Sequence, residues 1–153
     1  MRIGEICSRD VVTCKANSSA FELARLMRDE HVGSVIVVDD SDGQDVPVGI
    51  VTDRDLVIQV LATQVEPQAV TAGDMMKPAC TVLESEVVYD AIWTMRRAGA
   101  RRLPVVDGSN SLFGIVSADD LAQFLAAEIT ELSRISPQQR RIEADRFASS
   151  SGR

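Results

Sequence analysis

Continuous apolar runs and helically spaced apolar residues alternate along most of the chain. The continuous runs, Val35 to Asp39 and Leu103 to Asp107, are typical of strands that are covered on both faces. Each is followed by a turn rich in Gly, Asp and Ser and then by a second apolar run, at Val48 to Val51 and at Leu112 to Val116. The pattern therefore predicts two pairs of consecutive strands.

A helix is predicted before and after each strand pair. A short strand, Val11 to Cys14 or Cys80 to Leu83, leads into the first helix, which in the first half of the chain opens with the capping box Ser19-x-x-Glu22. The second helix has apolar residues at helical spacing, which predicts a face that packs on the strands. These residues are Leu56, Val57, Val60 and Leu61 in the first half and Leu121, Phe124 and Leu125 in the second.

The two halves are copies of one unit with the order β-α-β-β-α. A shift of 68 positions places Thr13 on Thr81 and Met27 on Met95, and after a slip of three residues Gly49-Ile50-Val51 falls on Gly114-Ile115-Val116. A unit of about 60 residues has little core of its own, so we expect the two copies to pack against each other. The predicted fold class is α/β (α+β).

Three segments follow from this organisation. We predict a first repeat at residues 1–66, a second repeat at 67–128 and a C-terminal helical tail at 129–153, with a linker over Ala62 to Gly73. In the tail, Ser136-Pro137 is expected to restart the helix as N-cap and first helical residue. A polar helix from Gln138 to Phe147 should follow, and the last residues are expected to be disordered.

Composition and charge exclude several classes of protein. The chain has 153 residues, 45% of them hydrophobic, which suffices for a buried core, and its net charge of −7 argues against binding nucleic acid or an anionic membrane. The start lacks a signal-peptide layout and the apolar runs are too short to cross a bilayer, so we expect a cytoplasmic protein. Cys7, Cys14 and Cys80 lack CxxC spacing and are expected to be reduced, buried structural thiols, with a redox or metal role as the alternative.

The stretch "GIVTDRDL" at residues 49–56 returns as "GIVSADDL" at 114–121. Thr52 with Asp55, and Ser117 with Asp120, have the spacing of a capping box, which would imply no ligand. The same carboxylate near a helix N-terminus also suits the two vicinal hydroxyls of a ribose. The residues alone leave both interpretations open.

Longer stretches around these motifs resemble the tandem cystathionine-β-synthase (CBS) domain pair, also called a Bateman module. "HVGSVIVVD" precedes "GIVTDRDL", and "GARRLPVVD" precedes "GIVSADDL", at matching spacing in the same order of elements. The resemblance implies a pseudo-twofold pair of CBS repeats with two clefts, each able to hold an adenosine-containing ligand. It also implies that Asp55 with Thr52, and Asp120 with Ser117, bind ribose.

The resemblance suggests the remaining contacts as well. Arg101 and Arg102 lie where the family commonly carries phosphate-binding residues, and Arg54 adds a charge to the first motif, where the second has Asp119; we therefore expect unequal clefts. The alternative for the arginines is a solvated basic patch. An adenine slot is expected near four residues that would equally suit any core: Val12, Ile36, Cys80 and Pro104.

These observations predict a standalone regulatory module that binds AMP, ADP or ATP, with S-adenosylmethionine or NAD less favoured, and that acts on a partner protein, as a homodimer. We expect no enzymatic activity, catalytic cofactor or metal, since GxSxG, P-loop and GxGxxG motifs are missing and His31 is the single histidine. The alternative is a ligand-free interaction protein in which the repeated motifs only cap helices. Thiol-based redox sensing is a third hypothesis.

Overall fold

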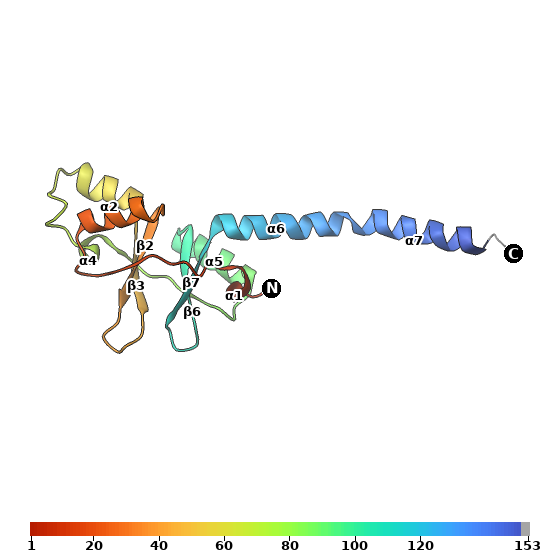
Figure 1. Cartoon of the computed structure of the whole chain (residues 1–153), viewed down its shortest axis with the longest axis horizontal. Helices are drawn as coiled ribbons and strands as arrows, with labels where there is room; N and C mark the ends of the chain where they lie inside the picture. Colours follow the sequence, from red (N-terminus) through yellow and green to blue (C-terminus); the bar gives the residue numbers. More distant parts are fainter. Residues whose placement is uncertain (151–153) are drawn as a thin grey trace. The chain divides into compact units, whose positions relative to one another are not determined.

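Two β-sheets with the same pairing scheme form the framework of the protein (Figure 1). The computed structural model describes residues 1–150, with side chains up to residue 146. The first sheet has the order β1-β2-β3-β4, and the second has the order β5-β6-β7. The strands of the first sheet are β1 (Thr13–Lys15), β2 (Ser34–Asp39), β3 (Val46–Thr52) and β4 (Lys77–Pro78). Those of the second are β5 (Val82–Leu83), β6 (Arg102–Val106) and β7 (Leu112–Ser117).

The pairing confirms the duplication. In each sheet a short strand lies parallel to the buried central strand, which pairs antiparallel with the strand that follows it. The register shifts at equivalent places, between Val37 and Val38 and between Val105 and Val106. The first strand of each repeat begins later than predicted, because the paired register starts only at Thr13 and at Val82.

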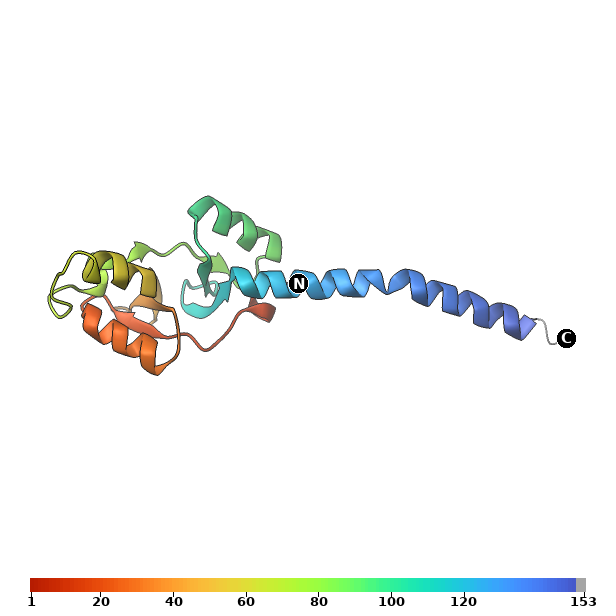
Figure 2. The same cartoon turned by 90° about the horizontal axis from the view of Figure 1, so that it is seen from above.

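Helices α2 (Ala20–Asp29) and α5 (Val88–Ala98) are equivalent in the two repeats. The predicted capping box of α2 is confirmed: Ser19 Oγ accepts from the Glu22 N–H at 3.2 Å, and Glu22 Oε2 accepts from the Ser19 N–H at 2.7 Å. Helix α2 buries Leu23 and Met27, and it lies side by side with the second helix of its repeat (Figures 1 and 2). The first repeat therefore covers one face of its sheet with two helices.

The second helix of the first repeat differs from the prediction. It begins as α3 (Asp53–Leu56) and continues as a π-helix, η1 (Val57–Leu61), whose Ala62 N–H donates to the Val57 carbonyl at 2.9 Å. The wider turn changes the helical phase. As a result Val60 is buried, whereas Val57 and Leu61 are 53% and 69% exposed and do not belong to the packed face that a 3.6-residue period predicts.

Two short helices that the sequence did not predict each pack at the edge of the repeat to which they do not belong in sequence. We call this the exchange of edges. Helix α1 (Ile3–Ile6) joins the second repeat: the Ile3 N–H donates to Glu86 at 2.8 Å, and Ser8 and Ile115 exchange hydrogen bonds at 2.9 Å. Helix α4 (Ala72–Met75) joins the first repeat, whose buried cluster includes two of its residues, and β4 then pairs with β3. The linker is thus shorter than predicted, because its last residues cap and start α4.

The glycine that leads each repeated motif makes this exchange possible. A Cβ on Gly114 would lie 2.6 Å from the carbonyl oxygen of Ser8, and a Cβ on Gly49 would lie 2.3 Å from the sulfur of Met76. Both glycines therefore permit the close approach of a segment that belongs in sequence to the other repeat.

The contacts divide the chain into a unit of Met1–Ala118 and a second unit from Asp119 onward. The second unit consists of α6 (Ala118–Ser133) and α7 (Ile135–Ser150). Helix α7 begins before Ser136, so Ser136-Pro137 lies inside its first turn rather than at its cap; proline is tolerated there because the first N–H groups of a helix have no intrahelical partner.

Part of the prediction of disordered last residues falls on residues 151–153, which lie outside the described residues. The side chain of Phe147, the last residue of the predicted polar helix, also lies outside them. Within the described part of the chain, no helix combines the length and the hydropathy needed to cross a bilayer.

Candidate functional site

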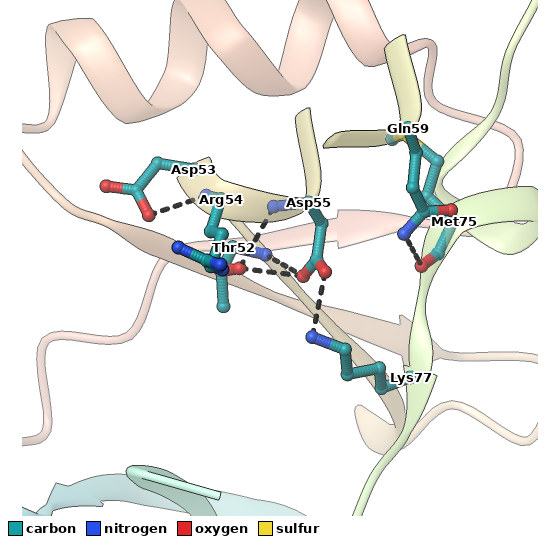
Figure 3. Close-up of polar contacts among 7 residues, drawn as sticks. All are labelled: Thr52, Asp53, Arg54, Asp55, Gln59, Met75 and Lys77. Carbon is teal, nitrogen blue, oxygen red and sulfur yellow. Dashed lines mark hydrogen bonds and ion pairs between the residues drawn. The ribbon is translucent and has the colours of Figure 1, made fainter. Parts of the chain in front are cut away.

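The first copy of the repeated motif forms a complete capping box (Figure 3). Thr52 ends β3 and caps α3, and its Oγ1 accepts from the Asp55 N–H at 3.3 Å. In return, Oδ2 of Asp55 accepts from the Thr52 N–H at 2.9 Å and from the Thr52 hydroxyl at 2.7 Å. One oxygen of the carboxylate therefore holds the helix start.

The other oxygen of Asp55 faces a lysine from a different element. Lys77 of β4 places its Nζ 2.8 Å from Oδ1 of Asp55 (Figure 3). The Asp55 side chain is only 6% exposed, whereas that of Lys77 is 64% exposed. Burial raises the pKa of Asp55, but hydrogen bonds from Lys77 and Thr52 and the lysine charge outweigh it, so the pKa of this carboxyl lies below its ordinary value. Asp55 is thus a buried carboxylate with a solvent-exposed counterion.

A second capping box in the same chain shows what the cap alone requires. Thr71 and Asp74 start α4 with the same three hydrogen bonds, at 2.9, 2.7 and 3.3 Å. Hydrogen bonds from Thr71 lower the pKa of Asp74, and no lysine contributes. The ion pair with Lys77 is therefore an addition to the cap at Asp55, not part of it.

A cleft of about 340 Å³ lies beside the first motif and takes residues from both repeats. The first repeat supplies Ile50 and the residues around Thr52, and the second supplies the segment from Ala98 to Arg102. Six of the predicted ligand residues line it: Thr52, Arg54, Cys80, Arg101, Arg102 and Pro104.

The lining of this cleft is strongly cationic. Arg54, Lys77, Arg101 and Arg102 face it, against the single carboxylate of Asp53. In a chain with a net charge of −7, such a concentration of positive charge favours an anionic occupant. Guanidinium groups in particular match the geometry of phosphate oxygens.

A second cleft of about 240 Å³ is built from the equivalent positions. Val12 corresponds to Cys80 and Ile115 to Ile50, so each cleft joins the residues just before the first strand of one repeat to the motif strand of the other. Of the predicted ligand residues, Val12 and Arg102 line this second cleft. Arg102 lines both clefts, and the second adds His31 and Asp10, so their charges differ.

Asp55 itself lines neither cleft; its partner Lys77 and its neighbour Arg54 line the first. Ile36 is fully buried in β2, opposite Ile50, and lines neither cleft. Ser117 ends β7 opposite Arg102, and Asp120 lies in the first turn of α6. Their role in ribose binding stays a prediction.

Lys77 is a residue of this cleft that the sequence analysis missed. It lies in a strand of only two residues, which is too short to show a hydrophobic period. Its one signal was composition, since the chain contains two lysines and the other, Lys15, pairs with Asp40 elsewhere in the first repeat.

The cysteines and acidic residues provide little other chemistry. Burial, and the charge of Glu22, raise the pKa of Cys14 to about 11, so its thiol is largely protonated and slow to react at neutral pH. Cys80 lines the first cleft. Among the residues that the structure describes, no three His, Cys, Asp or Glu side chains cluster as metal ligands would.

Comparison with known proteins agrees with this architecture. The family model of the CBS domain matches residues 3–62 and 72–127. A protein of Methanopyrus kandleri is 41% identical over 133 residues, which are 84% of this chain and 66% of that protein.

Two solved structures are similar to this chain. A CBS domain protein of Pyrobaculum aerophilum complexed with AMP has a TM-score of 0.71 and 26% identity, over 78% of this chain and 89% of that one. The CBS domain pair of protein MJ0100, in complex with 5′-methylthioadenosine and S-adenosylmethionine, has a TM-score of 0.71 and 25% identity, over 84% and 98% of the chains. With the duplicated sheets and the family match, these similarities show that the chain belongs to the CBS domain family, as a tandem pair of CBS repeats.

Proposed function

We propose that the first cleft binds an adenosine nucleotide and that the protein is a regulatory module. The observation that carries this proposal is the convergence of Thr52 and Arg54 from one repeat with Arg101 and Arg102 from the other around one cationic cleft. The AMP and S-adenosylmethionine complexes of the two similar structures support the adenosine part of the ligand.

The cleft divides into parts suited to the parts of such a ligand. We propose that Oδ1 of Asp55, the carboxylate oxygen that the cap does not use and that pairs with Lys77 of the lining, accepts from ribose hydroxyls. Ile50, Cys80 and Pro104 offer an apolar wall for the base, and the arginines offer donors for phosphate. We assign no catalytic step to these residues: the ligand is bound and released unchanged.

Regulation follows from the cleft's position between the repeats. A ligand that contacts both repeats favours the arrangement in which those contacts form, and this differential affinity is what couples binding to a partner protein. We further propose that the protein acts in the cytoplasm as a homodimer. Exposed apolar side chains of the first unit, among them Tyr89 and Trp93 of α5 and Val57 of η1, favour self-association.

The test is calorimetric titration with adenosine, AMP, ADP, ATP, S-adenosylmethionine and NAD, on the native protein and on Asp55→Ala and Asp120→Ala. Binding at the first cleft should be lost in Asp55→Ala and kept in Asp74→Ala, the matched control that removes a cap of the same geometry. Nucleotide should also slow alkylation of Cys80, which lines the cleft, but not of Cys14.

The exposed aromatic residues of α5 also favour the alternative function, a ligand-free interaction protein. That alternative predicts no binding by any of these compounds at about 1 mM, where even a free energy of about −4 kcal/mol would be detected. In that case Asp55→Ala would change stability alone.

A further inference from the structure

The unequal exposure of the two partners in the Asp55–Lys77 ion pair leads to an inference about how the first cleft is loaded. It rests on the proposed function, since it concerns the ligand of the same cleft. Asp55 Oδ1 is the oxygen that a ribose would need, and in the described structure Lys77 Nζ occupies it at 2.8 Å. Ligand and lysine therefore compete for one acceptor.

The ammonium group of Lys77 can contact another part of the cleft when it leaves Asp55. It lines the cleft together with Arg54, Arg101 and Arg102, and its side chain is mostly exposed, so it is not held by packing. A buried carboxylate needs a counterion or donors at all times, but ribose hydroxyls satisfy that need as donors. Once they do, the ammonium group is released close to where the phosphates lie.

We propose that Lys77 is a ligand-displaced counterion. It neutralises Asp55 while the cleft holds no nucleotide, and it transfers to the phosphate groups when ribose takes its place. Each bound phosphorylated nucleoside thus gains one cation contact that an unphosphorylated nucleoside cannot use, while both must displace the same lysine. The residue therefore sets the preference for phosphorylated over unphosphorylated adenosine ligands.

The second capping box explains why this is a role beyond folding. Asp74 caps its helix with the same hydrogen bonds and no lysine. Helix capping alone consequently gives no reason for a cation at Asp55. What distinguishes Asp55 is its burial together with an ion pair to Lys77, a residue that lines the cationic cleft.

The experiment compares ADP with adenosine as probes, by calorimetric titration of the native protein, Lys77→Met and Lys15→Met. In Lys77→Met the affinity for ADP should fall about tenfold, as expected for one charge-assisted contact, while that for adenosine stays or rises. The ratio of the two affinities should therefore collapse. Lys15→Met removes the only other lysine, which pairs with Asp40, and should leave both affinities unchanged.

Equal loss of ADP and adenosine affinity in Lys77→Met would overturn the inference, because it would make Lys77 a structural partner of Asp55 only. An unchanged ratio would overturn it as well. If the native protein binds neither probe, the proposed function fails with it, so the two failures are distinguishable.

A second measurement covers the case in which Lys77→Met does not fold. Reductive methylation with ¹³C keeps the charge of the two lysines and gives each a separate NMR signal. The Lys77 signal should move on addition of ADP, and the Lys15 signal should stay. A Lys77 signal that stays still while ADP binds would contradict the transfer.

Discussion

The two oxygens of Asp55 have separate partners, so the cap does not exclude a ligand at the same side chain. Oδ2 completes a capping box with Thr52, while Oδ1 faces Lys77 at the edge of the cleft. The capping and ligand-binding interpretations of Thr-x-x-Asp are therefore compatible, because each uses a different oxygen. A residue pattern that fits two functions can serve both when the side chain has two equivalent atoms.

The lowered pKa of Asp55 predicts a specific dependence of stability on pH. A carboxyl whose folded-state pKa is depressed stabilises the protein above its unfolded pKa and loses that contribution as pH falls through the folded pKa. Asp55→Asn should therefore lower the free energy of unfolding by about 2 kcal/mol at pH 7, as for a buried, charge-assisted hydrogen bond.

The difference between the native protein and Asp55→Asn should shrink as the pH falls below about 4. Urea denaturation between pH 7 and pH 2.5 measures it. Asp74→Asn is the control: it should destabilise less at pH 7, because Asp74 is exposed and has no lysine contribution. A difference at Asp55 that is independent of pH would contradict the ion pair.

His31 has a left-handed backbone at the end of α2, with φ of 55°. The equivalent residue in the second repeat is Gly99, with φ of 62°. Glycine adopts this conformation without the steric cost that a side chain carries. His31→Gly should therefore raise the free energy of unfolding by about 0.5 kcal/mol, the relief of strain less the added entropy of the unfolded chain.

The reverse change tests the same argument. Gly99→Ala should destabilise by about 1 kcal/mol even though a Cβ there would meet no atom within 4 Å, since the strain lies in the backbone. Thermal and urea unfolding of both variants give the comparison. Loss of stability in His31→Gly would instead assign the imidazole a stabilising contact in the second cleft, which it lines.

At the scale of elements, the repeated Gly-Ile-Val strand needs its glycine because another segment packs against it, and at Gly114 this segment is Cys7 and Ser8. A Cβ on Gly114 would lie 2.6 Å from the Ser8 carbonyl oxygen and 2.8 Å from the Cys7 sulfur, and the carbonyl cannot move without breaking the pairing of Ser8 with Ile115. Gly114→Ala should cost about 1 to 3 kcal/mol, as for other cases of overpacking.

Hydrogen exchange should show where this cost appears. The amides of Ile3, Gly4 and Ser8 donate to the second repeat and should exchange faster in Gly114→Ala. Gly108→Ala is the control, because a Cβ there meets nothing within 4 Å. Unchanged protection of the N-terminal segment would mean that the second sheet moves instead.

The sequence predicted the elements whose signal is local. The central strands, their turns and the cap at Ser19 all follow from patterns within a few residues, and each is confirmed. Periodicity could not predict the π-helix, because the apolar residues around Val57 have the same spacing in sequence whether the helix is an α-helix or a π-helix. Nor could it predict α1 and β4, which have four and two residues.

The site was predicted in part for the same reason. Six of the eleven predicted ligand residues line the first cleft, since their motifs are contiguous in sequence. The sequence could not predict the exchange of edges between the repeats, because it depends on contacts between segments that are far apart in sequence, such as β4 with β3 and Ser8 with Ile115. Lys77 enters the cleft through that exchange, so its role could be found only from the fold.

At the scale of the whole molecule, the repeats of the first unit complete each other. The buried cluster of the first repeat includes Ala72 and Met75, which follow the linker. Conversely, Ile3 at the start of the chain is fully buried and hydrogen-bonds to Glu86 of the second repeat. Removal of residues 1–8 should therefore destabilise both repeats.

Urea unfolding followed by Trp93 fluorescence and by circular dichroism should give coincident transitions in the native protein. Two separate transitions would show that the repeats fold independently.

The exchanged edges also bear on how the chain is made. Residues 2–8 leave the ribosome before their partners, near Glu86 and Ile115, which are synthesised about 80 to 110 residues later. The first sheet likewise gains its fourth strand only after Lys77 and Pro78 have emerged. Residues 2–8 thus stay unpaired almost until synthesis of the first unit ends, and both clefts form late, after the two copies have packed against each other.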